Sequence, residues 1–263
     1  MERILNRPLV NTFGWLGVNG TAADVPEEIK EEKYVIESGS ERTVILNEAA
    51  HISAEIEENA VFKLVQIRRP EEGAKTVNDI SVKCGDGARF EWYRVIFGGG
   101  ATYDNCSVAL DGKGSSFKAA VGYRLCGEEI YDVNCEAIHT GQKTVSDIFA
   151  SGVLSDKAFK LLRGTIDLRR GCAGAVGKEL EDVLLVDETV RCQTVPVILC
   201  SEEDVEGDHG ATIGRPDEQL IYYMESRGLD RETILEQLSR AKLDAVIRRI
   251  PDEKTVQALL EEE

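Results

Sequence analysis

The feature that most constrains this chain is a long succession of short runs in which apolar and polar residues alternate. The runs fill residues 34–213, and typical examples are RTVILNE, VFKLVQIRR and KAFKLLRGTIDLRRG. Clusters of Gly, Asn, Asp and Ser separate them, and no stretch of this zone has the 3.6-residue period of a helix. A period of two predicts β-strands, and the near absence of proline within the runs suits continuous ladders.

A succession of this kind can fold as a sandwich, a barrel or a solenoid. Cys84, Cys106 and Cys126 follow one another at intervals of 22 and 20 residues, and Cys172 precedes Cys192 by 20. These intervals are close to one coil of a β-helix, in which equivalent side chains stack along the interior. The spacing therefore favours a solenoid and predicts that these thiols stack on one another.

The two ends of the chain differ from this β body. Residues 1–33 are polar and irregular, and we expect them to lie across the body with Phe13 and Trp15 as an aromatic anchor. Residues 214–263 have helical character, and their first two helices are predicted to begin at Asp217 and Asp230. The apolar stripe of the second helix comprises Ile234, Leu235, Leu238, Ala241, Leu243, Val246 and Ile247. These short helices cannot form a core alone, so they must dock on the β body, another copy or a partner, or cap the open end of a solenoid.

Charge and cysteine content exclude several classes of function. The 263-residue chain carries a formal net charge of -17, which disfavours nucleic acids and anionic membranes as partners. No apolar run reaches the roughly 18 residues that span a bilayer, and the first residues do not resemble a signal peptide. Seven cysteines without a CxxC pair argue against a disulfide framework or a zinc knuckle. We therefore expect free thiols in a reducing cytoplasm.

The stretch DVEGDHGATIGRPDEQLIYYMESRG, residues 204–228, concentrates the candidate chemistry. His209, one of three histidines, lies between small residues directly before the first helix. A neutral imidazole beside carboxylates can ligate iron or zinc, whereas iron–sulfur clusters usually require thiolates. The glycine-rich loop after Phe97 is followed by a strand and not by a helix, so we interpret it as a turn and not as a phosphate cradle.

The segment from Pro196 to Gly228 resembles the C-terminal signature of the SufB/SufD family, the scaffolds of the SUF iron–sulfur cluster assembly system. The matching residues are Pro196, the run His209 to Gly214, the run Asp217 to Leu220, Tyr223, and the run Ser226 to Gly228. The resemblance implies a right-handed parallel β-helix with a short N-terminal segment and a C-terminal helical region. It also implies that this helical region docks a SufC-like ATPase, so that this chain binds no nucleotide, and that the chain forms a homodimer or pairs with a paralogous scaffold.

The site residues carried over from the family are incomplete. His209 occupies the position of the family's interface histidine, whereas the cysteine of SufB-type members is replaced here by Glu181. The resemblance thus predicts a site for iron or a transient cluster built from His209, Glu181 and Asp208, with Cys200 as a nearby thiol. The expected ATPase contacts are Leu220, Tyr222, Tyr223, Arg227 and Gly228.

Two other functions compete with a non-enzymatic scaffold. One is a β-helix hydrolase, lyase or acyltransferase that uses His209 as acid–base, although neither a hexapeptide period nor a Ser–His pair with a third member is present. The other is an interaction module without a metal.

Overall fold

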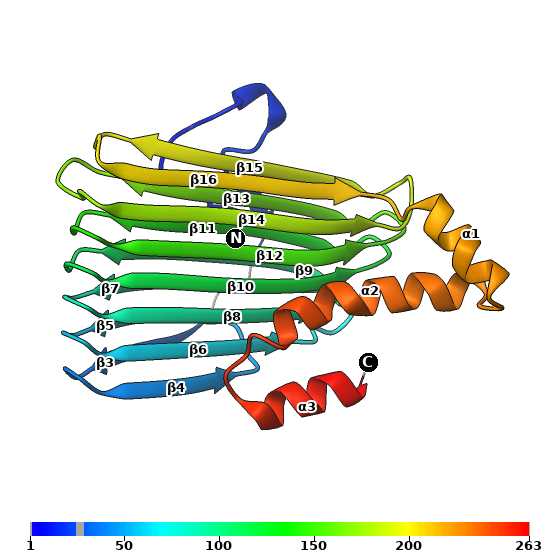
Figure 1. The fold of residues 1–263 in the computed structure, drawn as a ribbon, viewed down its shortest axis with the longest axis horizontal. Coiled ribbons are helices and arrows are strands. Elements are labelled where there is room, and N and C mark those ends of the chain that lie inside the picture. The colour runs from blue at the N-terminus through cyan, green and yellow to red at the C-terminus, as the bar shows by residue number, and fades with distance from the viewer. Residues whose placement is uncertain (1, 25–28, 263) are drawn as a thin grey trace.

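Residues 34–213 form a flattened parallel β-helix in a computed structural model that describes residues 2–24 and 29–262 (Figure 1). Each coil contributes one strand to each of two parallel sheets of seven strands. The odd sheet contains β3 (Lys30–Ile36), β5 (Ala50–Ile56), β7 (Ala74–Cys84), β9 (Gly100–Leu110), β11 (Ile130–His139), β13 (Phe159–Leu168) and β15 (Arg191–Cys200). The even sheet contains β4 (Glu41–Leu46), β6 (Val61–Arg68), β8 (Arg89–Phe97), β10 (Ser116–Leu125), β12 (Val145–Leu154), β14 (Ala175–Leu185) and β16 (Val205–Gly214).

The interior between the two sheets holds the main core, and its rows of side chains follow the strand register. Phe62, Phe90 and Phe117 stack at centroid distances of 5.7 and 5.6 Å in successive coils. Alternation along each strand sends every second side chain into this interior, which is why the period-two pattern identified the strands. The solenoid expected from the sequence is confirmed.

The predicted stacking of cysteines at intervals of 20 to 22 residues is wrong. Cys106 pairs in register with Cys135, 29 residues later, and Cys84 pairs with Leu110. In-register residues are 20 apart at the first coil, between Lys30 and Ala50, and reach 32 at the last, between β13 and β15. Two strands of about ten residues and two turns need more chain than the cysteine intervals provide.

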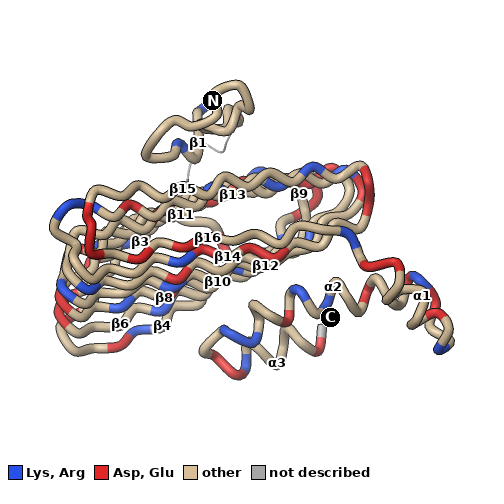
Figure 2. The backbone as a smooth tube through the Cα atoms, turned by 45° about the horizontal axis from the view of Figure 1, so that its top comes forward, with Lys and Arg blue, Asp and Glu red and all other residues tan. Residues whose placement is uncertain are grey.

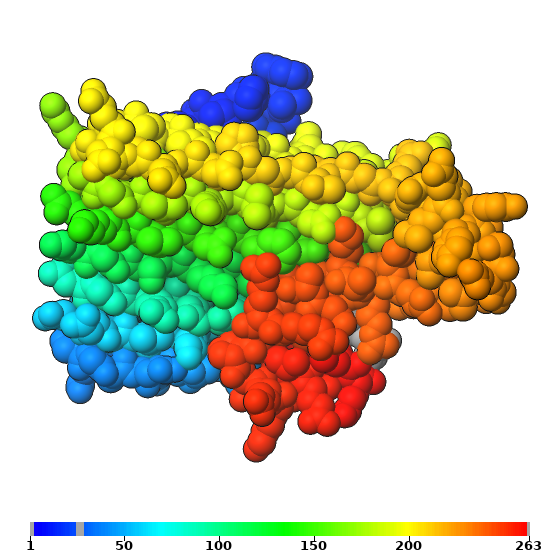
Figure 3. All heavy atoms as spheres, viewed as in Figure 1, coloured from blue at the N-terminus to red at the C-terminus, as the bar shows by residue number. Residues whose placement is uncertain are grey.

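The N-terminal segment crosses the outer face of the odd sheet, as expected, but its anchor is polar. It contains β1 (Glu2–Leu5), a 3-10 turn (Gly14–Leu16) and β2 (Thr21–Asp24), which pairs antiparallel with β1. The expected aromatic anchor is wrong, because Phe13 is 56% and Trp15 83% exposed. The turn that carries Trp15 projects beyond the last coil (Figures 1 and 3).

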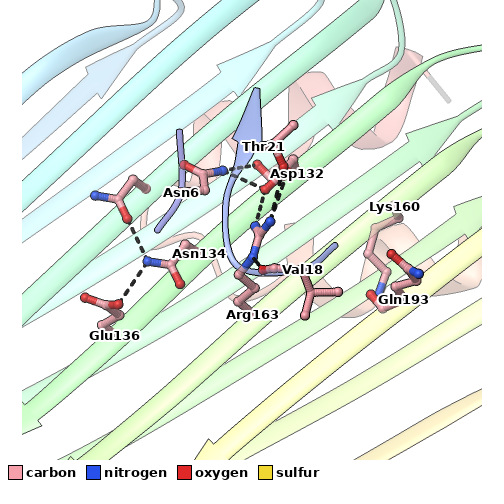
Figure 4. A network of polar contacts seen from close by, with 10 residues as sticks. Asn6, Val18, Thr21, Asp132, Asn134, Glu136, Lys160, Arg163 and Gln193 are labelled. Carbon is pink, nitrogen blue, oxygen red and sulfur yellow. Dashed lines mark hydrogen bonds and ion pairs between the residues drawn. The ribbon is translucent and has the colours of Figure 1, made fainter. Parts of the chain in front are cut away.

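A buried ion pair holds this segment on the sheet. The Arg163 guanidinium donates to the Asp132 carboxylate at 2.5 Å and to the Val18 carbonyl oxygen at 2.5 Å (Figure 4). The Asn6 amide donates to the Asp132 Oδ1 atom at 2.7 Å, and the Thr21 hydroxyl donates to the other carboxylate oxygen. Charge-assisted bonds of this kind are the strong ones in a protein, so the segment is part of the folded body.

The three C-terminal helices lie on the opposite side of the solenoid from the N-terminal segment (Figure 2). They are α1 (Glu218–Ser226), α2 (Arg231–Ile247) and α3 (Glu253–Glu262). The Asp217 and Asp230 side chains accept from the amides of Gln219 and Thr233, so both predicted helix starts are confirmed.

Helix α2 packs along the outer face of the even sheet and does not cap an end of the solenoid. Leu243, Val246 and Ile247 are fully buried against residues of β6, β8 and β10. Gly122 provides the room, since a Cβ atom there would lie 3.2 Å from the Val246 side chain. The outer sheet face is itself apolar at this point, which explains why the helix covers the face and leaves the last coil open.

Candidate functional site

The candidate site lies at the last coil, where β15 and β16 are the edge strands of their sheets. His209 is in the middle of β16 and is exposed. Its register partner on the preceding coil is Glu179, and Asp208 pairs with Lys178. Successive side chains of a strand point to opposite faces, so His209 shares the inward face with Glu179 while Asp208 points outward.

The structure separates the remaining sequence-predicted residues. Glu181 is 3% exposed and points inward on β14, two residues from Glu179. Cys200 is exposed at the far end of β15, in register with Leu168, and its thiol donates to the Glu202 carbonyl oxygen at 3.1 Å. Of the four expected donors, His209 and Glu181 therefore face the interior of neighbouring coils, whereas Asp208 and Cys200 lie apart from them.

A buried polar cluster lies beneath the last coil. The Lys160 ammonium donates to Glu181 Oε1 at 2.5 Å, to Thr194 Oγ1 at 2.9 Å and to the Gln193 carbonyl oxygen at 3.2 Å (Figure 4). Glu181 also accepts from the Tyr123 hydroxyl at 3.1 Å and, on its other oxygen, from the Thr194 hydroxyl at 2.5 Å. Both charges of this ion pair are fully shielded from solvent.

Glu179 lies in a different environment. Burial and, to a lesser degree, the nearby Glu181 carboxylate raise its pKa to about 7. The carboxylate occupies the space over Gly164 of β13, where a Cβ atom would lie 2.1 Å from Glu179 Oε1. Sequence reasoning missed both Glu179 and Lys160, because an alternating strand shows which residues point inward but not which of them meet.

The described residues of a single copy do not bring three His, Cys, Asp or Glu side chains into a geometry that could hold a metal ion. All seven cysteines are unpaired, and burial raises the pKa of the Cys192 thiol at the entrance of the last coil. The glycine-rich turn after Phe97 is not an open cradle, since the Glu129 carboxylate accepts from the Gly99 amide at 2.5 Å. In the part of the chain that the structure describes, no helix has the length and apolar character to span a membrane.

Helix α1 carries the expected partner-binding residues. Tyr222 is 74%, Tyr223 55% and Leu220 42% exposed, and Ile221 is the buried residue of the helix. The Arg227 guanidinium lies 5.2 Å from the centroid of the Tyr223 ring, and Gly228 has a φ of 94° just past the helix. Two aromatic rings and a cation thus face outward from a helix that projects from the body (Figure 3).

Comparison with known proteins agrees with this architecture. Residues 26–241 match the family described as SUF system FeS cluster assembly, SufBD core domain. The chain is 28% identical over 179 residues to the iron-sulfur cluster assembly protein SufD of Bacillus subtilis, covering 67% of this chain and 40% of that protein. It is 26% identical over 168 residues to a SufBD family protein of Mycobacterium tuberculosis, covering 64% of this chain and 20% of the relative.

The SufD protein of Escherichia coli is 24% identical over 165 residues, which cover 63% of this chain and 39% of that protein. The matches thus span less than half the length of these curated relatives. The family match nevertheless covers most of this chain, including the last coil and the start of the helical region. The chain therefore belongs to the SufBD core family of iron–sulfur cluster assembly proteins.

Proposed function

We propose that this chain is a non-enzymatic scaffold that assembles iron–sulfur clusters at its open last coil, in a reducing cytoplasm, together with a SufC-like ATPase. The observation that carries the proposal is the position of His209, exposed on an edge strand directly over a buried charged cluster. Family membership supplies the chemical context, and the unpaired thiols suit a reducing compartment.

We infer that two copies meet at this coil. Edge strands as long as β15 and β16 present unpaired backbone groups that favour pairing with another chain. Pro196 lies in the middle of β15 and removes one backbone donor, whereas β16 has no proline. Pairing through β16 would place the two His209 side chains at one shared interface, and a paralogous scaffold could take the place of the second copy.

We assign ATPase docking to α1. Its exposed face offers Tyr222, Tyr223 and Arg227, residue types that are enriched at binding hot spots. The ion pair between Arg231 and Glu218, with a shortest distance of 2.7 Å, ties the start of α2 to α1. A motor bound to α1 would therefore act on α2 and, through it, on the even sheet.

Anaerobic reconstitution tests the scaffold function. We expect the wild-type chain, incubated with iron and sulfide, to gain the absorption of an iron–sulfur cluster, and His209→Ala to lose at least half of it. Because His209 is exposed, the substitution should leave the fold intact, which circular dichroism would verify. His51→Ala is a matched control, since His51 lies on β5, away from the last coil. Equal cluster content in the wild type and His209→Ala would reject the assigned site.

A further inference from the structure

The two inward carboxylates of β14 differ in what they contact. Each oxygen of Glu181 accepts hydrogen bonds, and the ammonium of Lys160 neutralises the carboxylate at 2.5 Å. A metal ion could recruit Glu181 only by displacing these partners and leaving the fully buried Lys160 charge unpaired. Breaking a buried pair in this way is strongly unfavourable, so the structure does not leave Glu181 available as a ligand.

Glu179, by contrast, has an oxygen without a partner. The side chain is 3% exposed, and its Oε2 atom is buried without a hydrogen bond in the described structure. An unsatisfied buried carboxylate oxygen costs several kcal/mol on general grounds, which is why such atoms in native proteins commonly accept from an ion or water. Gly164 leaves the space that the carboxylate occupies.

Glu179 is also next to His209. The two residues are register partners on β14 and β16, and neighbouring strands are about 4.8 Å apart. Their side chains point to the same face, toward the interior at the open end of the solenoid. Carboxylate oxygen and neutral imidazole nitrogen together suit a divalent first-row metal such as Fe²⁺.

We propose that Glu179 and His209 form a divalent cation site at the open last coil, and that Glu181 with Lys160 is its supporting ion pair and not a ligand. This inference rests on the proposed function, in that the cation bound there would be the Fe²⁺ that enters the cluster. One copy provides two ligands, which is consistent with the lack of a three-donor group among the described residues of a single chain. A second copy paired through β16 supplies the other two.

Metal titration of the purified chain tests this site directly. Under anaerobic conditions, Fe²⁺ binding would be measured by equilibrium dialysis and Co²⁺ binding by its visible absorption. We expect Glu179→Gln and His209→Ala each to weaken both metals at least tenfold. Asp208→Asn is the matched control, because it removes the same charge one residue from His209 on the opposite face, and it should bind as the wild type does.

A second measurement keeps the test valid if a variant folds differently. Without metal, Glu179→Gln should unfold at a higher temperature than the wild type, because it removes an unpaired buried charge. With saturating Co²⁺, the unfolding temperature of the wild type should rise and that of Glu179→Gln should not. Glu181→Gln should lower the unfolding temperature, because Lys160 loses its counter-charge, and should still be stabilised by Co²⁺.

The possible results separate the cation site from the scaffold function. If Glu179→Gln binds Fe²⁺ as tightly as the wild type, or if Asp208→Asn loses binding equally, the assignment of Glu179 is wrong, whatever the fate of cluster assembly. If Glu179→Gln and His209→Ala lose the cation but both still build a full complement of cluster, the cation site stands and its proposed use in assembly is wrong.

Discussion

At the scale of single residues, neighbours of the same type in this solenoid have different roles because of what they contact. His209 is exposed at the edge, whereas His139 is fully buried between Thr144 and Ser146, at 2.7 and 2.9 Å from its two ring nitrogens. Burial lowers the pKa of His139 from 6.5 to about 4. Neither hydroxyl can neutralise an imidazolium, so this histidine stays neutral in the folded chain.

The lowered pKa of His139 predicts a loss of stability in mild acid. Between about pH 6.5 and 4 the unfolded chain binds a proton that the folded chain does not, so the free energy of unfolding falls as the pH falls through this window. The full effect is on the order of 3 kcal/mol by linkage. His139→Gln should be less stable at pH 7 but should show a shallower decline, measured by urea unfolding at pH 7, 6 and 5. Parallel pH profiles for the two proteins would contradict this assignment.

Glu179 acts in the opposite direction over part of the same range. Its folded-state pKa is raised, so the folded chain holds a proton below about pH 7 that the unfolded chain releases until about pH 4.5. Acidification through this window therefore favours the folded chain and offsets part of the His139 effect. Comparison with the His139 variant, and not the wild-type profile alone, isolates the histidine.

At the scale of elements, α2 has two kinds of attachment to the even sheet. Its C-terminal half is held by buried Leu243, Val246 and Ile247, whereas Lys242 pairs with Asp182 of β14 at 2.6 Å. Glu236 accepts from both terminal nitrogens of Arg124 on β10, at 2.5 and 2.8 Å. Exposed ion pairs contribute little and are screened by salt, so the half of α2 nearest α1 is the more easily displaced half.

Helix α1 provides the prediction at this scale. A variant with Leu220→Ala, Tyr222→Ala and Tyr223→Ala should lose at least tenfold in affinity for a SufC-like ATPase, since exposed aromatic residues often dominate interfaces. Its unfolding temperature should be close to that of the wild type, because the three side chains face solvent. Lys254→Ala with Gln257→Ala on the exposed face of α3 is the control, and isothermal titration calorimetry is the measurement. Unchanged affinity would reject α1 as the docking helix.

The local elements were predictable from the sequence, whereas the long-range pairings were not. Alternation identified the strands, and Asp217 and Asp230 marked the helix starts because a capping carboxylate acts on amides two or three residues away. The pairing of Cys106 with Cys135 depends on the turn lengths between them, and an alternating pattern does not encode those lengths as a coil repeat. For the same reason the sequence singled out Glu181 and missed Lys160, its partner on another strand.

At the scale of the whole molecule, the open last coil predicts dimerisation through β16. Ala211 points inward at this edge, in register with Glu181. Ala211→Lys should therefore place two like charges at the interface and convert the dimer to a monomer. Glu206→Lys is the control, because Glu206 points to the outer face of the same strand.

Light scattering would distinguish the two states, because the chain mass is 29.0 kDa and a dimer has twice that value. A wild-type chain that is monomeric, or an Ala211→Lys variant that stays dimeric while Glu206→Lys dissociates, would contradict pairing through the inward face of β16.

The polar anchor of the N-terminal segment also constrains the order in which the chain can fold during its synthesis. Asn6 and Thr21 bind Asp132, more than a hundred residues later, and the Val18 carbonyl needs Arg163. Coils can stack on their neighbours as they leave the ribosome, because each pairs mainly with adjacent ones. The first residues to be translated must therefore wait for β13 before they settle, and until then the outer face of the growing odd sheet is open to chaperones.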